Sequence, residues 1–472
     1  MDKKEILQHL AAFWPQFGLH KIKCMKTGKD IISVFGEDCS YPVWHREEWL
    51  KHADPPFTEF DSGRPFFDQL WELFQKCPIP HNVGVGNENC EYTDDWWYSK
   101  NCFLSHSGMN CEDVSYVYRS LGMKDCQFCV FCFDSELCTD LINCRNCYST
   151  VYALNSRQCR DSAFIFDCRN CSDCLFSWNL RNKQYCIFNQ QYSKEEYERE
   201  RAKYDFYLRE HYEKGKEIFA DILRSKAWWP CLQQVQCENV DGDFLDKCKN
   251  CSNTFFVQES EDCKNVLRAF KAKNCVNSVS TMDSELVEMS CMAQDKSYDI
   301  KYSNNVVQSS FLEYCNHCYD CEHCFGCCGL VGKKYHIFNQ EYTPEEYEIK
   351  VLEIKTKLRE EKIYGQFYPL YFAANLYEES LAGVHWPQGE NSFKDKPFHI
   401  TERDKQFCEK NRVPLPNTFY VNRLMDNLRW MFFTGELRET TCAETGDRIL
   451  TGIPKEFDGR ILSEQAYLDK IA

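Results

Sequence analysis

The sequence predicts a mainly β protein built on a duplicated, parallel β-helix-like solenoid rich in cysteine, with inserted helices and degenerate zinc-ribbon-like end units (α+β overall). Three observations predict this fold class. The stretch from Cys90 to Cys328 holds 27 of the 32 cysteines. Thirteen of these 27 directly follow Asn or Asp. Two long segments recur at an offset of 150 residues, which indicates that the central region is present twice.

The Asn-Cys and Asp-Cys pairs indicate a backbone corner that is repeated many times. Asn and Asp tolerate left-handed backbone conformations and form hydrogen bonds within their own turns. Successive corners are 21 residues apart from Cys90 to Cys111, 18 from Cys126 to Cys144 and 21 from Cys147 to Cys168. Such spacings predict a stack of short strands with a coil of about 18 to 21 residues.

The duplication is clearest in two matching segments. LRNKQYCIFNQQYSKEEYE at 180–198 recurs as LVGKKYHIFNQEYTPEEYE at 330–348. At the same offset, Cys168, Cys171 and Cys174 coincide with Cys318, Cys321 and Cys324. We therefore expect two superposable solenoids.

Helices are expected at the start of the chain and after each solenoid. The patterns predict helices from Lys3 to Phe13 and from Phe66 to Cys77, and Ser193 and Thr343 are hydroxyl N-caps followed by glutamates. The two later helices are predicted to extend to about Leu223 and Lys362. The resulting division is 1–87 (N-terminal zinc-ribbon-like unit with helices), 88–192 (first solenoid), 193–234 (helical insertion), 235–342 (second solenoid), 343–395 (helix and aromatic segment) and 396–472 (C-terminal zinc-ribbon-like unit).

The two ends of the chain resemble each other. CMKTGKDII, starting at Cys24, parallels CAETGDRIL, starting at Cys442. Each looks like a Cys-x-x-Cys-Gly knuckle whose second cysteine is replaced, by Thr27 and by Thr445. We expect both ends to fold without a metal of their own.

With these boxes the chain resembles an uncharacterised family of cysteine-rich proteins from uncultured bacteria and their phages. Members of that family resemble repeated Cys-x-x-Cys coils with a YxIxNxxYSxEEY box and zinc-ribbon-like ends. The likeness runs through 24–49, 183–198, 333–348 and 413–416. It implies a fold but no activity, and the threonines at the two knuckles depart from its pattern.

Composition narrows the class of protein. A net charge of -16 and a pI near 5.3 argue against broad affinity for nucleic-acid backbones. The sequence shows no signal-peptide core and no apolar run of about 18 residues, so we expect a cytoplasmic protein (or a phage virion component) that does not enter a membrane. In a reducing compartment the cysteines are expected to be thiols or metal thiolates.

Zinc is the predicted cofactor, because a Cys-x-x-Cys turn supplies two ligands at once and stacked turns would supply four. Exchange of Cys186 for His336 between the copies fits a zinc ligand. The alternatives are cysteine ladders that pack without metal and, less favoured, an iron–sulfur cluster on Cys318, Cys321, Cys324 and Cys328. The candidate ligands are Cys126, Cys129, Cys144, Cys147, Cys168, Cys171, Cys174, Cys186, Cys248, Cys251, Cys315, Cys318, Cys321, Cys324, Cys327 and His336.

No catalytic signature is complete. His45 and Glu47 lack the Pro-Cys-x-x-Cys partner of a deaminase, and Gly84-Val-Gly86 lacks the rest of a nucleotide-binding fingerprint. His317 and His323 are interpreted as solvent-facing turn residues. We therefore expect a non-enzymatic, zinc-binding scaffold or protein-interaction protein. A nucleic-acid-associated zinc protein and a thiol or iron–sulfur redox protein are the alternatives.

Overall fold

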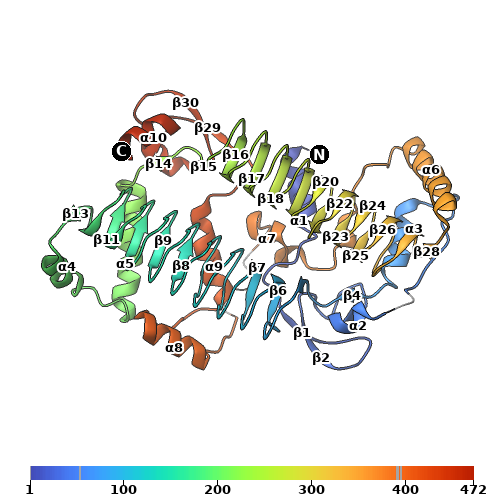
Figure 1. Ribbon diagram of the computed structural model, residues 1–472, viewed down its shortest axis with the longest axis horizontal. Helices are drawn as coiled ribbons and strands as arrows, with labels where there is room; N and C mark the ends of the chain where they lie inside the picture. Colours follow the sequence, from blue (N-terminus) through green and yellow to red (C-terminus); the bar gives the residue numbers. More distant parts are fainter. Residues whose placement is uncertain (1, 53–54, 390–392, 394–395, 472) are drawn as a thin grey trace. The chain divides into compact units, whose positions relative to one another are not determined.

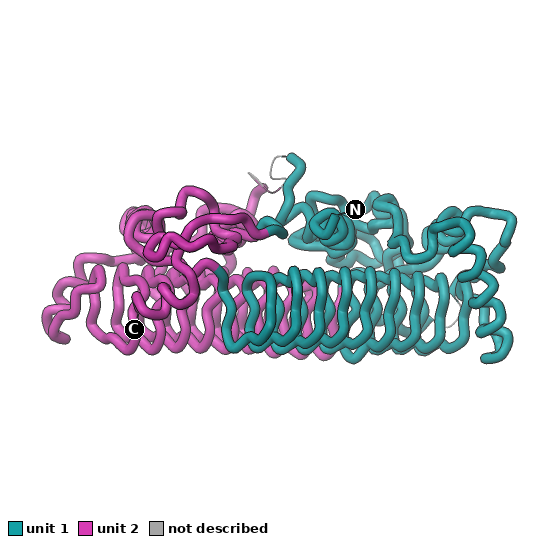
Figure 2. Tube along the Cα trace, turned by 90° about the horizontal axis from the view of Figure 1, so that it is seen from above, with its two compact units in different colours: residues 1–82, 232–390, 434–436 teal, residues 83–231, 391–433, 437–472 magenta. Residues whose placement is uncertain are grey.

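The computed structural model describes residues 2–52, 55–389, 393 and 396–471, and it confirms a mainly β solenoid architecture with inserted helices. Residues 1, 53–54, 390–392, 394–395 and 472, from the predicted end units and aromatic segment, lie outside the described residues. Two compact units alternate along the sequence (Figure 2). Unit 1 contains 1–82, 232–390 and 434–436, and unit 2 contains 83–231, 391–433 and 437–472. Each unit therefore combines one solenoid with segments distant in sequence.

Most coils of both solenoids are 12 residues long. Strand pairs such as Ala163↔Leu175 and bridges such as Arg157↔Arg169 join residues 12 apart in parallel register. The predicted coil of 18 to 21 residues is thus wrong. A left-handed corner occurs at every third residue. The spacings of 18 and 21 residues are multiples of three, because the prediction considered only the corners that precede a cysteine.

The coil is built from three-residue steps. In each step the first residue pairs with the neighbouring coils, the second has a left-handed backbone, and the third points inward. Arg157, Gln158 and Cys159 show the pattern: the Arg157 N–H donates to the Cys168 carbonyl (2.9 Å), Gln158 has φ 54°, and Cys159 is buried. The left-handed corners predicted at Asn and Asp are confirmed, for example at Asn143 (φ 52°).

The first solenoid belongs to unit 2. Between 109 and 139 its coils continue through isolated bridges with the same register. Its strands run parallel except for the last pair (Figure 1). They are β5 (Gly84–Val85), β6 (Thr93–Trp97), β7 (Ser105–Met109), β8 (Thr139–Ile142), β9 (Val151–Leu154), β10 (Ala163–Phe166), β11 (Ser172–Trp178), β12 (Gln184–Ile187) and β13 (Gln190–Gln191).

The second solenoid belongs to unit 1. One coil is lengthened to 13 residues, as in the pair Cys291↔Asn304, by consecutive left-handed residues Asp295 and Lys296. Its strands are β15 (Gln234–Val235), β16 (Asp241–Asp246), β17 (Ser252–Gln258), β18 (Lys264–Phe270), β19 (Val276–Met282), β20 (Glu285–Glu288), β21 (Cys291–Gln294), β22 (Tyr298–Lys301), β23 (Asn304–Val307), β24 (Ser310–Glu313), β25 (Asn316–Tyr319), β26 (Glu322–Phe325), β27 (Lys334–Ile337) and β28 (Gln340–Glu341).

The repeated Ile-Phe-Asn-Gln box ends each solenoid. Phe338 and Asn339 both have left-handed backbones (φ 50° and 66°), which reverse the chain into antiparallel β28. The Asn339 side chain accepts from the Cys328 N–H and donates to the Cys328 carbonyl, both at 2.9 Å, and Asn189 does the same for Trp178. The box therefore caps the last coil.

Helices with capping boxes follow each cap, as predicted. They are α4 (Lys194–Arg201) after Ser193 and α6 (Pro344–Glu360) after Thr343. The helix predicted from Ser193 to about Leu223 is broken in two. It ends as α4, and the chain then begins a second helix, α5 (Arg209–Ser225). The break brings the Phe206 ring to 4.8 Å from Phe164.

In each unit, a helix packs on a column of aromatic rings of the solenoid. In unit 2, Tyr152, Phe164, Phe176 and Phe188 stack at 5.2 Å intervals under α5, where a Cβ at Gly215 would lie 2.7 Å from Phe164. In unit 1, α3 (Phe66–Phe74) places Phe66 5.0 Å from Tyr314 and 5.8 Å from Phe338. Residues 1–82 thus help to close the second solenoid.

The end units share one design. An antiparallel hairpin is followed by a two-residue strand that pairs in parallel with a segment next to a solenoid. In unit 1 these strands are β1 (His20–Lys23), β2 (Asp30–Ser33), β3 (Val43–Trp44) and β4 (Ile79–Pro80); in unit 2 they are β29 (Arg438–Thr441), β30 (Arg448–Thr451), β31 (Ile461–Leu462) and β14 (Trp229–Pro230).

The remaining helices are short. Unit 1 has α1 (Lys3–Ala11), α2 (Arg46–Leu50), η1 (Leu370–Phe372), η2 (Tyr377–Glu379) and α7 (Leu381–His385); unit 2 has α8 (Glu402–Asn411), α9 (Tyr420–Leu428), η3 (Arg429–Met431), η4 (Lys455–Arg460) and α10 (Glu464–Ile471). Among the described residues, no helix combines the length and the apolar character needed to cross a bilayer.

Candidate functional site

The candidate ligands lie on the inward positions of the two solenoids, where they form columns along the coil axis. Every candidate cysteine is at most 2% exposed, and they belong to the two solenoid cores. In the first solenoid, one column holds Cys126, Cys138, Cys174 and Cys186, a second Cys147, Cys159 and Cys171, a third Cys132, Cys144 and Cys168, and a fourth Cys129. The cysteine periodicity is thus a core pattern.

Each inward thiol has backbone carbonyl partners. The Cys126 thiol donates to the carbonyl two residues earlier, Lys124 (3.0 Å), and to that nine residues later, Ser135 (3.3 Å). The same pair of contacts recurs for Cys168 and for Cys251. Because the contacts come from the coil itself, they follow from position rather than from a ligand.

Serine occupies the same inward positions and makes the same kind of contact. The Ser135 hydroxyl donates to the Phe133 carbonyl (3.0 Å) and accepts from the Cys147 N–H (3.1 Å). The Cys144 sulfur accepts in the same way from the Ser156 N–H, at 3.5 Å. Cysteine and serine therefore have one structural role here.

The expected stacking of one Cys-x-x-Cys pair on another is not found. With 12 residues per coil, Cys168 and Cys171 lie between Ser156 and Cys159 on one side and Leu180 and Lys183 on the other. The pair Cys248 and Cys251 is followed by Ser260 and Cys263. The register thus separates pairs that the longer predicted coil would have superposed.

One coil of the second solenoid carries cysteine at all four inward positions: Cys315, Cys318, Cys321 and Cys324. Their thiols donate to carbonyls two residues earlier at 3.4, 3.6, 3.3 and 3.6 Å. Cys327 begins the next coil, and His336 pairs in register with Cys324 as Cys186 does with Cys174. This coil gathers the densest set of candidate ligands.

The pKa values of the core thiols shift in both directions. Burial raises the pKa of Cys168 and Cys324 well above the usual thiol range and that of Cys111 to about 12, whereas at Cys126 and Cys321 burial is outweighed by hydrogen bonds from neighbouring thiols, which lower the pKa. In the part of the chain that the structure describes, no three His, Cys, Asp or Glu side chains form a group that could hold a metal ion. The thiol-to-carbonyl contacts of the candidate cysteines are those of hydrogen-bonded packing.

The possible iron–sulfur ligands, Cys318, Cys321, Cys324 and Cys328, do not all lie in the inward columns. Cys328 is outside the inward columns, and its thiol is hydrogen-bonded to that of Cys77, with the Asn316 amide at 3.9 Å.

The interpretation of His317 as solvent-facing is wrong, because it is 3% exposed and burial lowers its pKa to about 3. His323 is partly exposed and stacks between Phe311 and Tyr335.

At the knuckle of each end unit, one cysteine lies in a cradle of N–H donors. The Cys24 sulfur accepts from the His45 N–H (3.2 Å), and the Cys442 sulfur from the Ser463 N–H (3.3 Å). Burial opposes ionisation of Cys442, but the donors from Ser463, Thr445 and Glu444 outweigh it and lower its pKa to about 6. Thr445 thus stabilises the thiolate where a ribbon would have a second ligand.

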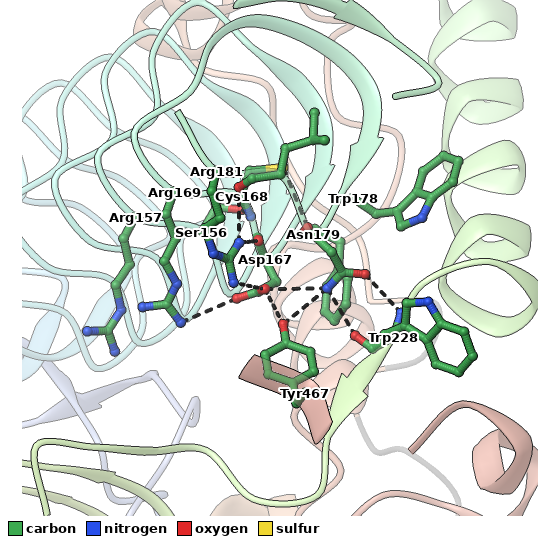
Figure 3. Close-up of polar contacts among 12 residues, drawn as sticks. Ser156, Arg157, Asp167, Cys168, Arg169, Trp178, Asn179, Arg181, Trp228 and Tyr467 are labelled. Atoms are coloured by element: carbon green, nitrogen blue, oxygen red, sulfur yellow. Dashed lines mark hydrogen bonds and ion pairs between the residues drawn. The ribbon is translucent and has the colours of Figure 1, made fainter. Parts of the chain in front are cut away.

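Buried carboxylates that the sequence analysis missed anchor the C-terminal segment of unit 2. Asp167 accepts from Arg181 (2.5 Å), Arg169 (3.3 Å) and the Tyr467 hydroxyl, while Asn179 bonds the Trp228 backbone (Figure 3). Asp140 likewise accepts from Arg423 on α9, at 2.9 Å. The only signal in the sequence was an Asp at a corner, which many corners share.

The chain was compared with known proteins. No family model matches it, and no curated protein does. The proposals below therefore depend on geometry and chemistry alone.

Proposed function

We propose that this protein is a non-enzymatic scaffold for protein interactions, with solenoids stabilised by hydrogen-bonded thiol and hydroxyl columns. The observation that carries the proposal is an aromatic column on the second solenoid, formed by Tyr298, Phe311, His323 and Tyr335, in which the first two rings are exposed and the last two contact Tyr347 of α6. Tyr298 and Phe311 are 39% and 40% exposed. Neighbouring rings lie 5.6, 4.7 and 5.1 Å apart.

Such a column suits protein recognition. Aromatic side chains are enriched at the centres of interfaces because they bury much area at little cost in conformational entropy. Coil pairing fixes these rings in place, so little order has to be gained on binding. The coils that precede the column present Glu261, Lys273 and Glu285 in register, and such alternating charges can serve as a polar rim.

The first solenoid supplies an internal comparison. At the offset of 150 residues, Tyr148 corresponds to Tyr298, Asp161 to Phe311 and Asp173 to His323. The duplicated scaffold therefore tolerates carboxylates at positions where the second solenoid has rings. The aromatic column is accordingly a feature of one surface and is not required by the coil.

A site-specific photo-cross-linker tests the proposal. Placed at Tyr298 in the native cells, it should capture a defined protein that the same probe at Tyr148 does not capture. Phe311→Asp should weaken binding of that purified protein at least about tenfold, as expected for loss of a central aromatic contact, without changing the melting temperature. Equal capture from both positions, or binding unaffected by Phe311→Asp, would count against a scaffold that uses this surface.

Nucleic-acid binding is the second candidate, favoured by one observation. Arg145, Arg157, Arg169 and Arg181 pair in register on four successive coils of the first solenoid. A basic column supports binding to phosphates. If this column binds single-stranded RNA, fluorescence anisotropy should show affinity that falls steeply between 50 and 200 mM salt and is weakened by Arg157→Gln, but not by Lys194→Gln on α4.

Zinc, expected from the sequence, is the alternative to metal-free packing of the thiols. Its strongest candidate is the coil of Cys315, Cys318, Cys321 and Cys324. Elemental analysis of protein purified anaerobically in reductant tests it directly, with Cys321→Ser expected to lower the zinc content if the coil binds metal. Cys275→Ser, at a buried cysteine of the same solenoid that is not a candidate ligand, is the matched control.

A further inference from the structure

We propose that unit 2 binds a small oxyanion, with inorganic phosphate as the model ligand, in a pocket between α5, residues 414–418 and α9. The pocket has a volume of about 180 Å³. It is lined by one face of α5 (Arg209, Glu213 and Lys216), by Thr418 and by Arg423 of α9. Neither the thiol columns nor the aromatic column contributes to it.

The lining holds three basic side chains (Arg209, Lys216 and Arg423) and three acidic ones (Asp140, Glu213 and Asp426), and the way they pair leaves the α5 wall positive. Asp140, with 4% of its side chain exposed, is matched by Arg423 at 2.9 Å and accepts from Asn427 at 3.3 Å. The carboxylate of Glu213 pairs with both Arg209 (3.4 Å) and Lys216 (3.3 Å), and Arg209 also donates to the Leu415 carbonyl. Asp426 also lines the pocket, but it pairs with Arg429 outside the lining. The wall formed by α5 therefore keeps about one uncompensated positive charge.

The donor types fit an oxyanion. A guanidinium presents paired N–H groups that match two oxygens of a phosphate or carboxylate, and an ammonium adds a third charged donor. Arg209 and Lys216 lie two helical turns apart on one face of α5, so both reach the same pocket. The small volume selects an ion of phosphate size over a nucleotide.

Binding would have a structural consequence. The α5 wall packs on the aromatic column of the first solenoid, whereas residues 414–418 and α9 belong to the C-terminal segment of the same unit. An anion held by both walls would cross-link them, so the ligand should stabilise the folded state of unit 2. A ligand that binds only the folded state raises stability with its concentration.

The test uses the full-length protein and inorganic phosphate. Titration followed by ³¹P line broadening should show saturable binding, and phosphate should raise the melting temperature above that in sodium chloride of equal ionic strength. Lys216→Met should weaken phosphate binding about tenfold or more, as expected for loss of a charge-assisted hydrogen bond. Lys214→Met, an exposed residue on the same helix outside the pocket, should bind like the parent protein.

Arg209→Gln gives a second variant in case Lys216→Met does not fold, and circular dichroism checks both. Sulfate should compete with phosphate, because the proposed recognition is of a small tetrahedral oxyanion. Unsaturable broadening, an equal effect of chloride, or full phosphate affinity in folded Lys216→Met or Arg209→Gln would overturn the proposal.

Discussion

Many of the residues inside the coils are small and able to bond the backbone, among larger apolar ones such as Leu141 and Ile165. Cysteine and serine combine both properties at the same positions, as Ser135 and Cys144 show. Small apolar residues such as Ala153 also fit, although their side chains cannot make that hydrogen bond. The abundance of cysteine follows from this narrow interior without requiring metal.

Substitutions at Cys144 measure this equivalence. Cys144→Ser should change the free energy of unfolding by less than about 1 kcal/mol, because a hydroxyl can accept from the Ser156 N–H as the sulfur does. Cys144→Leu should destabilise by about 1 to 3 kcal/mol through overpacking. Urea unfolding in reductant compares the two, and a serine variant as unstable as the leucine variant would contradict the shared role.

The thiolate of Cys442 should make stability depend on pH. Its folded pKa is lowered to about 6, below the usual value of 9.0, so ionisation favours the folded state. The contribution is complete above about pH 9 and is lost as the pH falls through 6. Urea unfolding of the parent protein and Cys442→Ser should therefore differ more at pH 9 than at pH 5.5. An equal difference at both values would argue against a stabilised thiolate.

At the scale of elements, the coil ends where two consecutive left-handed residues reverse the chain. Asn339 combines that backbone with two hydrogen bonds to Cys328, so it both turns the chain and satisfies the last coil. The duplicated box was recognisable in the sequence, and so were the helices that follow it. Its role as a cap was not, because the partner carbonyl and N–H are 11 residues away.

Replacement of Asn339 separates the two parts of the cap. Asn339→Gly keeps the left-handed backbone and loses the side-chain bonds, whereas Asn339→Ala loses both. We expect losses of about 1 to 3 kcal/mol for glycine and a further ~1 kcal/mol for alanine. Chemical denaturation measures them, with Gln190→Ala, an exposed position in β13, as the control. Alanine less destabilising than glycine would show that the backbone conformation is not important.

The sequence predicted the solenoid class, the duplication and the left-handed corners, because these follow from local preferences repeated many times. It did not predict the 12-residue coil, since cysteine marks only some corners and their spacings are multiples of three. Long-range partners such as Asp140 and Arg423, 283 residues apart, leave no local signal. For the same reason, the packing of Phe66 on Tyr314 could not be foreseen.

At the scale of the whole molecule, the chain divides into two compact units. Each solenoid is closed by segments far from it in sequence, with residues 1–82 assigned to the second solenoid and residues 437–472 to the first. Contacts such as Asn339 to the Cys77 sulfur (3.3 Å) and Trp49 to the Tyr319 ring (4.8 Å) join the N-terminal segment to the second solenoid. Terminal segments are thus integral to the fold.

Deletion of residues 1–82 should therefore act on the distant solenoid. Hydrogen exchange should show loss of protection mainly in 232–341, because α3 and Trp49 no longer cover its aromatic rings. Protection in 83–191 should be largely retained, although that segment directly follows the deletion. Greater loss in 83–191 would contradict the assignment of the units.

The central claim, that the cysteines are packing residues, is tested most directly by thermal melting of the reduced protein with and without a strong chelator, alongside elemental analysis. If the thiols pack as hydrogen-bonded columns, the melting temperature should not change on chelation, and untreated protein should contain less than one zinc ion per chain. A structural zinc site contributes of order 10 kcal/mol to folding. Stoichiometric zinc together with unfolding of the solenoids on chelation would contradict the claim.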